Sequence, residues 1–496
     1  MEKYKYIYGA SVQGIQGFIF QTNSLKDIIG ASELVEKICT TLFASTYLQR
    51  GTPIVNAAGN IKCVYDDLSE CQKTVLEFPK AVMLEAPGIT ISQAVVKISA
   101  GNLEENFSQA MNLLEKKLKI QRNKPSRSMT VGYMGVERSR STGLPAVQVV
   151  GNDFLDEATC QKRILSEGGR ATVALAEKSF GINGLSVKNI ALNINSLTDR
   201  NDWIAIIHAD GNGLGQVVAR FSDSAQQLSS FSQKLEQVTL QAAHAAFKKI
   251  YTSEGYTQKD IIFPFRPVIL GGDDMTMICK ASLALEYTKV YLKEFEEATR
   301  QKLGACNGLT ACAGIAYVKS SYPFHYGYSL AETLCGKAKA VSKSPQMAQE
   351  GSLPPSSVMF YKVQGSFIER YDQMLLKEKT PQDGMSFSFG PYFLQPKDGY
   401  WSIDELQAEA AKLHGKDSNT VKTGIRKWMT AMHQDANRAQ QTAQRCYSVL
   451  SEANRAVFQK AVSAVKREGI QGVFYPAADM LDVNTIQNQE TKVQRI

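Results

Sequence analysis

The sequence predicts an α+β protein made of two similar ferredoxin-like units, a region that links them and a helical C-terminal region. Three observations support this fold class. Residues 203–362 follow the order strand, helix, hairpin, helix, strand, helix; residues 4–118 repeat that order more faintly; and beyond about residue 385 the pattern turns wholly helical. A chain of 496 residues can hold about three domains. We expect the boundaries at residues 1–120, 121–200, 201–384 and 385–496.

The first unit is the weaker copy. It is predicted to contain a short first strand, a long helix, two strands around a turn, a further helix, an alternating strand and a last helix that ends at Lys116 and Lys117. The clearest segments are Tyr6–Tyr8, Leu25–Phe43, Pro53–Val55, Ile61–Val64 and Ile89–Ile98. The turn at 57–60 reads Ala-Ala-Gly-Asn and carries no carboxylate.

The second unit has stronger signals. An apolar strand, Trp203–His208, is ended by Ala209–Gly213, and a long helical stretch follows. Two short strands then flank Gly271-Gly272-Asp273-Asp274, whose glycines allow a tight hairpin turn. The remaining segments are expected at Ser222–Tyr251, Pro267–Leu270, Met275–Cys279, Leu309–Val318 and Ser329–Val341.

The C-terminal region is expected to be helical. Ser402 with Glu405 three residues later forms a capping box. An apolar stripe at helical spacing follows, and we expect the tail after Asp482 to be polar and frayed. The stripe consists of Cys446, Leu450, Ala453, Val457, Ala461 and Val465.

Composition excludes several classes of protein. Apolar residues make up 44% and charged residues 21%, and no apolar run is long enough to cross a bilayer, so we expect no membrane partner. The first residues lack the apolar core of a secretion signal, which predicts a cytoplasmic protein. The nine cysteines are scattered and predict no disulfide framework. The net charge of +8 is mild, but the stretch Lys116–Arg140 is strongly basic and suits either a phosphate-binding surface or a solvated helix end.

Two carboxylate motifs are the candidate catalytic site. Asp210 ends one strand, and Asp273 with Asp274 lies at the tip of a hairpin that should neighbour it in the sheet. Oxygen ligands in this number suit Mg²⁺ or Mn²⁺, and such ions can align a 3′-hydroxyl and stabilise a departing pyrophosphate. The alternative for each motif alone is a Gly-Asp turn or a helix cap. The glycines that would let the backbone approach a triphosphate are Gly211, Gly213, Gly215, Gly271 and Gly272.

At these residues the sequence resembles the large subunit of type III CRISPR effector complexes. Phe265–Val268 followed by the Gly-Gly-Asp-Asp hairpin is similar to that family's catalytic palm. Three more motifs occur in the family's order, so the resemblance covers nearly the whole chain. They are Gln13–Phe20 with Leu25-Lys26 and Gly30-Ala31-Ser32; Ala209–Gly215; and Ala313–Ala316 with Tyr322-Pro323 and Lys337–Lys339.

The resemblance implies two palm (nucleotidyl cyclase) domains and an enzyme that uses ATP to make a nucleotide second messenger once target RNA is bound. The product would be a cyclic oligoadenylate, or AMP joined to S-adenosylmethionine, with the acceptor held by the first palm. Guide RNA, target RNA and sibling subunits are the implied partners. The implied metal ligands are Asp210, Asp273 and Asp274, and the implied nucleotide-binding residues are Gly211, Asn212, Gly213, Leu214, Gly215, Gly271, Gly272 and either Lys337 or Lys339.

Three departures from the family pattern lead to further expectations. No His-Asp dipeptide occurs, so we expect no metal-dependent nuclease domain of the HD type. The linking region keeps only Cys160 of the family's four-cysteine zinc module, which predicts no zinc. Asn212 and Gly213 stand where the family usually has Asp and Asn, which removes one potential ligand.

Two other functions fit parts of the pattern. A diguanylate cyclase also uses a Gly-Gly-acidic-acidic hairpin, although here Met275 follows it where Phe is usual and no sensor domain is evident. A non-catalytic RNA-binding scaffold would need no metal ligands, and the retained Asp210, Asp273 and Asp274 argue against it. Because a constantly active site would drain ATP, we expect the isolated chain to be nearly inactive.

Overall fold

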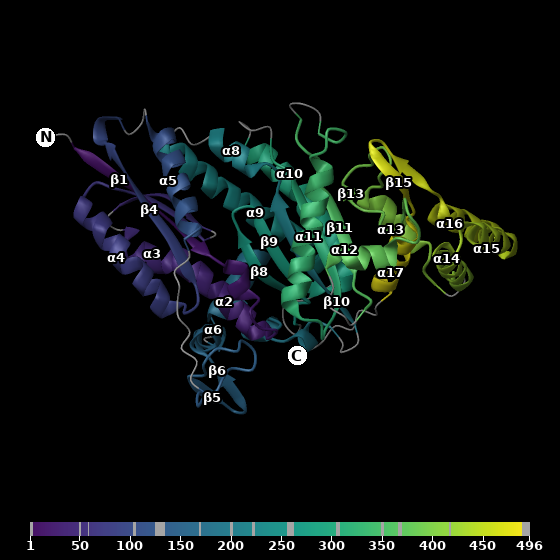
Figure 1. Cartoon of the computed structure of the whole chain (residues 1–496), viewed down its shortest axis with the longest axis horizontal. Coiled ribbons are helices and arrows are strands. Elements are labelled where there is room, and N and C mark those ends of the chain that lie inside the picture. Colours follow the sequence, from purple (N-terminus) through teal and green to yellow (C-terminus); the bar gives the residue numbers. More distant parts are fainter. Residues whose placement is uncertain are drawn as a thin grey trace.

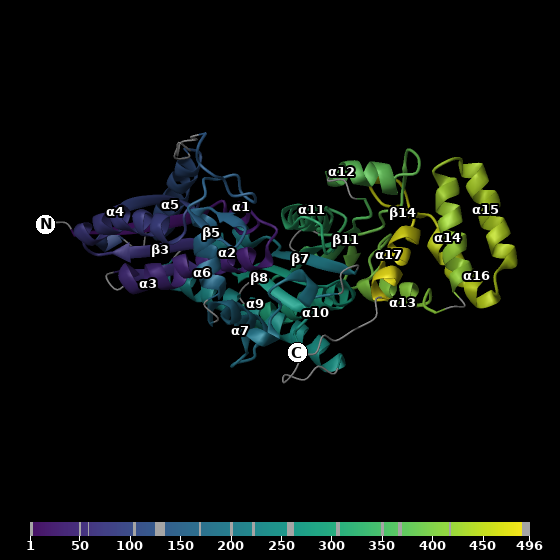
Figure 2. The ribbon, with the colours of Figure 1, turned by 90° about the horizontal axis from the view of Figure 1, so that it is seen from below.

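The computed structural model describes residues 3–48, 51–57, 59–102, 106–124, 134–167, 170–198, 202–220, 224–254, 262–303, 308–348, 352–365, 370–415 and 418–488. The molecule is elongated, with the first unit at one end, the second unit in the middle and the last helices at the other end (Figures 1 and 2). Part of the basic stretch Lys116–Arg140, residues 125–133, lies outside the described residues.

The first unit is a four-stranded antiparallel sheet with the order β2-β3-β1-β4, which is the ferredoxin-like arrangement. Helices α2 and α4 connect its strands as the sequence predicted, and α5 follows the last strand. The elements are β1 (Tyr4–Gln13), α1 (Ile15–Ile19), α2 (Leu25–Lys37), a π-helical turn (Ile38–Leu42), α3 (Phe43–Thr46), β2 (Thr52–Ala57), β3 (Asn60–Tyr65), α4 (Leu68–Glu85), β4 (Thr90–Ser99) and α5 (Phe107–Arg122).

The second unit repeats this order in the four strands β10-β7-β9-β8 and extends the sheet through β11 and β13. The short strand β13 pairs with β11 and so belongs to this sheet, although it lies beyond the boundary expected at residue 384. The elements are β7 (Trp203–Gly211), α8 (Leu214–Arg220), α9 (Ala225–Ser253), β8 (Phe265–Gly271), β9 (Asp274–Lys280), α10 (Ala281–Lys302), β10 (Ala311–Lys319), α11 (Phe324–Ser342), β11 (Ser357–Lys362) and β13 (Tyr392–Phe393).

Helix α2 packs the first unit against the second. Its Ser32 hydroxyl donates to the carbonyl of Val268, at the point where the register of β8 shifts between Pro267 and Ile269. Gly30 allows a close approach of the linking helix α6, because a Cβ at this position would lie 1.8 Å from the carbonyl oxygen of Lys162. The Gly-Ala-Ser motif therefore joins three regions of the chain. The linking region contains β5 (Gln148–Val150), β6 (Asp153–Leu155), α6 (Glu157–Glu167) and α7 (Arg170–Phe180).

The C-terminal region is mainly helical, but a small sheet interrupts it. Strand β12 pairs in parallel with β15, about 88 residues later in the chain, and β14 completes the sheet. The expectation of a wholly helical pattern was therefore wrong. The elements are α12 (Tyr371–Met374), β12 (Met385–Ser386), α13 (Ile403–Ala411), α14 (Asn419–Met432), α15 (Ala436–Val449), α16 (Glu452–Val462), β14 (Val465–Arg467), β15 (Ile470–Phe474) and α17 (Ala477–Gln487).

Two local expectations for this region need correction. The apolar stripe is not one helix, because α15 ends at Val449, α16 begins at Glu452 and Val465 lies in β14. The segment after Asp482 is not frayed as far as residue 488: α17 is almost wholly buried, and its Asp482 accepts from Lys379 at 2.8 Å. The Ser402–Glu405 capping box is present as predicted. None of the described helices is long and apolar enough to span a membrane.

Candidate active site

The first carboxylate lies at the end of a buried strand. Strand β7 is the central strand of the second sheet, and its residues from Ile204 to Ile207 are fully buried. Asp210 follows near the end of β7, where its side chain is 35% exposed. Strand β7 thus holds the backbone of Asp210 in place, and the Asp210 carboxylate is partly exposed to solvent at the edge of the sheet.

The second motif is the tip of the hairpin that the sequence predicted. Gly271 and Asp274 are the last paired residues of β8 and β9, and Gly272 in the turn has a φ of 64°. The Thr239 hydroxyl of α9 donates to the Gly272 carbonyl at 2.6 Å and ties the tip to the helix behind it. Strand β9 pairs with β7 so that Ala209 faces Met275, which places Asp274 beside Asp210.

Gly211 makes room for Asp273. A Cβ at position 211 would lie 2.8 Å from Oδ2 of Asp273, closer than carbon and oxygen atoms can approach without displacement. The glycine after Asp210 therefore serves a steric purpose in the site. The role that the sequence suggested for Gly211, to let the backbone approach a triphosphate, stays a prediction.

The crowded carboxylates have raised pKa values. Burial, together with the nearby negative charge of Asp210, raises the pKa of Asp273 to about 7. Burial also raises the pKa of Asp274 well above its ordinary value, with additional repulsion from Asp273 and Asp210. Three carboxylates therefore share a partly desolvated space that favours protons or cations.

Lys339 is the lysine that reaches this cluster. Its ammonium group donates to the Asp210 carboxylate and, at 2.8 Å, to the Gly211 carbonyl. Lys337 points elsewhere, because its ammonium group pairs with the exposed Asp372 at 3.0 Å. Of the two lysines that the sequence left open, the structure places only Lys339 at the carboxylates.

The loop after Asp210 divides into inward and outward residues. Asn212 is buried, and its side-chain amide donates to Thr310 Oγ1 at 3.0 Å and to Cys312 Sγ at 3.3 Å. Gly213 has a φ of 72°, Leu214 packs against the core, and Gly215 is exposed. Asn212 thus holds the loop to the neighbouring strand, and the open surface is at Gly213 and Gly215.

His208 is a site residue that sequence reasoning missed. Among the described residues, the one group of side chains that could hold a metal ion consists of His208, Asp210 and Asp274, with ligand atoms all within 4.8 Å of one another. Burial lowers the pKa of His208 to about 4, so the imidazole is neutral at pH 7. The only signal in the sequence was its position two residues before Asp210, which puts both side chains on one face of the strand.

The donor set fits a divalent cation. Asp210, Asp273 and Asp274 offer oxygen ligands within one cluster, and Lys339 is the one cation seen pairing with them among the described residues. A divalent ion would relieve the mutual repulsion that raises the pKa values of Asp273 and Asp274.

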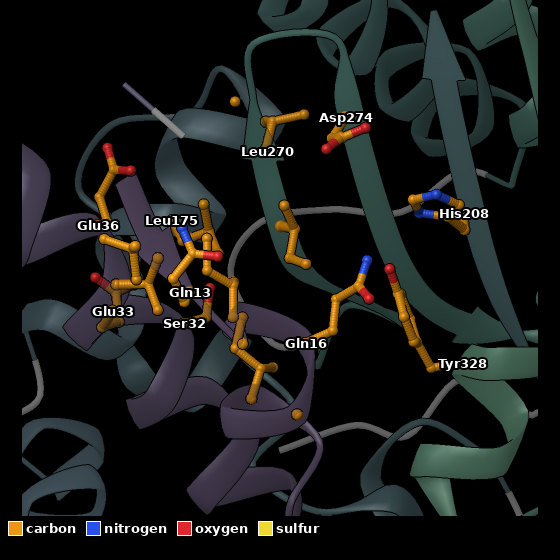
Figure 3. Close-up of a pocket in the computed structure, with 18 of the residues that line it drawn as sticks. Gln13, Gln16, Ser32, Glu33, Glu36, Leu175, His208, Leu270, Asp274 and Tyr328 are labelled. Atoms are coloured by element: carbon orange, nitrogen blue, oxygen red, sulfur yellow. The ribbon is translucent and has the colours of Figure 1, made fainter. Parts of the chain in front are cut away.

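A pocket of about 450 Å³ opens beside the cluster, between the two units. The segment Gln13–Gly17 and helix α2 line one side of it, and His208, Asp274 and Tyr328 line the other (Figure 3). Its volume is within the range of small-molecule sites. The pocket joins the candidate metal ligands of the second unit to a wall supplied by the first.

Glu33 gives the first-unit wall an unusual acidic group. Its Oε1 atom is buried without a hydrogen-bond partner, and burial raises the pKa of the carboxyl to about 7, although the positive charge of Arg266 opposes this shift. Glu36 also lines the pocket, but its carboxylate pairs with Lys178 at 3.2 Å. Glu33 is therefore an acidic residue of this wall whose Oε1 atom has no hydrogen-bond partner among the described residues.

The fold and the site together define a palm domain: a ferredoxin-like sheet with carboxylates at the end of its first strand and at the tip of its central hairpin. Residues 203–347 match the family model of Cas10/Cmr2, second palm domain, and belong to that domain family. No curated protein sequence matches the chain.

Solved structures show the same overall fold for nearly the whole chain. A crystal structure of a Csm1–Csm4 cassette in complex with cA4 matches with a TM-score of 0.59 and 15% identity, over 98% of this chain and 70% of that chain. The cassette in complex with pppApA gives 0.59 and 14% over the same shares. The cassette with one ATP gives 0.55 and 14%, again over 98% and 70%.

These matches confirm the recognition made from the sequence motifs. The family match covers residues 203–347, the second palm, and the rest of the chain shares its fold with the Csm1–Csm4 structures. The α+β fold class with two palm units is likewise confirmed. That the chain has no nuclease domain of the HD type and that it binds no zinc both remain predictions.

Proposed function

We propose that this protein transfers the adenylyl group of ATP to an acceptor held between its two palm units, releasing pyrophosphate and producing a nucleotide second messenger. The observation that carries the proposal is the cluster of Asp210, Asp273 and Asp274 at the edge of a pocket whose opposite wall comes from the first unit. The Csm1–Csm4 cassettes of the same fold hold ATP, pppApA or cA4, which supports adenine nucleotides as substrates.

Each residue of the site has a distinct part in this proposal. Asp210, Asp273 and Asp274 would hold Mg²⁺ or Mn²⁺, which activates an attacking hydroxyl and stabilises negative charge on the phosphates. Lys339 lies where its ammonium group can turn from Asp210 to a phosphate oxygen. Gly213 and Gly215 leave the loop surface open for the triphosphate, and Thr239 keeps the hairpin tip in place.

The acceptor is either a second ATP or S-adenosylmethionine. A second ATP would yield a cyclic oligoadenylate, in line with the ligands of the cassettes. The half-buried Glu33 carboxyl favours an acceptor that presents a hydrogen-bond donor or a positive charge, such as the amino group of S-adenosylmethionine or the exocyclic amine of adenine. A triphosphate would not sit against the ionised form of Glu33, because both are negatively charged.

Guide RNA, target RNA and sibling type III subunits are the partners that we propose. The Csm1 chains of similar fold occur with Csm4 and within a Csm interference complex. On this chain, the described basic residues of α5 and of the segment after it are the candidate phosphate contacts. Target RNA would switch activity on by favouring one arrangement of the two palms.

The assembled complex with α-labelled ATP, target RNA and Mn²⁺ or Mg²⁺ tests the proposal. Labelled product that forms only with target RNA supports it, and a product that needs added S-adenosylmethionine identifies that acceptor. In that case Glu33→Gln should reduce product about tenfold, whereas the matched variant Glu36→Gln should have little effect. Consumption of GTP alone would instead favour a diguanylate cyclase. If no nucleotide is consumed under any condition, the proposal fails and the scaffold reading stands.

A further inference from the structure

The cluster beside the pocket contains a nitrogen ligand as well as oxygen ligands. His208 and Asp210 lie two residues apart on β7, so both side chains are on the same face of the sheet. Asp274 comes from the neighbouring strand β9, and one ligand atom from each of the three residues lies within 4.8 Å of the others. The register of two central strands thus fixes the grouping.

The imidazole ring of His208 is held in one orientation. Its Nδ1 lies 3.2 Å from the Thr276 hydroxyl, which belongs to the residue directly opposite on β9. The ring also packs edge-on against Tyr328, with ring centres 5.5 Å apart. In the tautomer whose Nδ1–H donates to Thr276, the free electron pair is on Nε2. This is the arrangement usual for metal-binding histidines, whose second nitrogen bonds a fixed partner.

We propose that His208 is a protein ligand of the metal ion in this site and makes the site prefer Mn²⁺ to Mg²⁺. The inference rests on the proposed function, because it concerns the same metal site. Mg²⁺ is bound almost entirely through oxygen, whereas imidazole is a ligand for transition metals. One imidazole nitrogen beside two carboxylates therefore shifts the selectivity of the site toward Mn²⁺.

The competing explanation is that His208 is only a packing residue. It is 7% exposed, and both Thr276 and Tyr328 would contact it in either case. The two explanations differ in what happens to Mn²⁺ binding when the nitrogen is removed. A packing residue would affect Mn²⁺ and Mg²⁺ equally, through the position of Asp210, whereas a ligand affects Mn²⁺ selectively.

The test is electron paramagnetic resonance of Mn²⁺ added to the full chain without nucleotide. We expect a hyperfine coupling from an imidazole ¹⁴N in pulsed spectra, and its loss in His208→Gln and His208→Leu. Mn²⁺ affinity should fall about tenfold or more in these variants, while Mg²⁺ affinity, measured by competition, should change less than about threefold. Thr276→Val keeps the ring and removes only its partner, so it should retain the ¹⁴N coupling with weakened Mn²⁺ binding.

The possible results separate the two proposals. Mn²⁺ that binds without a ¹⁴N coupling would overturn the role of His208 and leave the proposed function standing. Equal loss of Mn²⁺ and Mg²⁺ affinity in His208→Gln, with unchanged thermal unfolding, would also overturn it. If neither ion binds the wild-type chain, and adding ATP restores no binding, the metal site of the proposed function fails as well.

Discussion

The two palm units have the same strand order, but only the second carries carboxylates at and beside its hairpin tip. By strand register, Ser11 and Asn60 of the first unit occupy the places of Asp210 and Asp274 in the second. Gly59 takes the place of Asp273, and its carbonyl accepts from the backbone N–H of Val12 at 2.8 Å. The first unit has therefore no carboxylate at any of these positions.

The space at the tip differs as well as the charge. A Cβ at Gly59 would lie 2.5 Å from Cδ1 of Ile15, so the first unit has filled the place of the second carboxylate with an apolar side chain. In the second unit Gly211 stands where the first has Val12, and it is this glycine that admits the Asp273 carboxylate. The comparison teaches that the hairpin tip of the second unit can hold its carboxylates because the neighbouring strand leaves room for them.

The strongest test of this comparison replaces equivalent residues of the two units by alanine. Asp274→Ala removes a proposed metal ligand and should lower nucleotide transfer by about 10³-fold, since the ion contributes several kcal/mol of charge stabilisation. Asn60→Ala changes the equivalent, exposed residue of the first unit and should leave the rate within about twofold of the wild type. Rates with labelled ATP in the assembled complex measure both. Similar losses in the two variants would contradict the asymmetry.

Steric exchange should have the next largest effect. Gly211→Val introduces the residue type that the first unit has at the equivalent position, Val12. The new side chain forces the Asp273 carboxylate to move and should reduce nucleotide transfer about 10²-fold. Gly336→Ala on α11, where a Cβ meets nothing within 4 Å, is the matched control and should retain full activity. A Gly211→Val protein with normal turnover would show that the hairpin tip tolerates a valine side chain at position 211.

The two lysines of α11, Lys337 and Lys339, test whether a positive charge beside the carboxylates is needed for activity. Lys339→Met removes the cation beside Asp210 and should lower the rate by about 10- to 100-fold, because it removes the proposed donor to the phosphates. Lys337→Met breaks only an exposed pair with Asp372 and should change the rate less than twofold. Steady-state rates at saturating ATP separate the two, and equal effects would reject the assignment of Lys339.

The smallest expected effect is on stability as a function of pH. The pKa of Asp273 is raised from its ordinary value to about 7, so the folded chain binds this proton more tightly than the unfolded chain does. Its stabilising contribution is present below pH 4 and is lost as the pH rises through about 7. The metal-free protein should therefore unfold a few degrees lower at pH 8 than at pH 6, and Mn²⁺ should reverse this.

Asp273→Asn is the variant that checks this pH effect by differential scanning fluorimetry. It should reduce the difference between pH 6 and pH 8. Glu33 has a raised pKa in the same range and contributes with the same sign, so Glu33→Gln should remove a separate part of the difference. An unchanged pH dependence in Asp273→Asn would mean that the carboxyl group is already ionised in the fold.

Local signals in the sequence predicted much of this architecture. The Gly-Gly-Asp-Asp hairpin and the strand before Asp210 follow from residues close together in the chain, and both were found where expected. Sequence order alone also showed the two copies. The close approach of Gly211 to Asp273 and the choice between Lys337 and Lys339 could not be predicted, because they depend on which strands and helices meet in space.

Long-range pairing explains the other differences. A single histidine within an apolar strand is typical of a buried core residue, and only the pairing of β7 with β9 brings His208 and Asp210 to Asp274. The polar end of α17 suggested a frayed tail, but Asp482 is buried because Lys362 and Lys379, more than 100 residues earlier, supply the opposite charge. Short strands such as β12 carry too few residues to show a periodicity.

The most direct test of the central claim compares the wild-type protein with the double variant Asp273→Ala, Asp274→Ala in the assembled complex. With α-labelled ATP, target RNA and Mn²⁺, the account predicts labelled product and one pyrophosphate for each AMP unit incorporated from the wild type, and neither from the variant, while both proteins assemble equally well. Product formation that survives in the double variant would place the chemistry elsewhere and contradict the account.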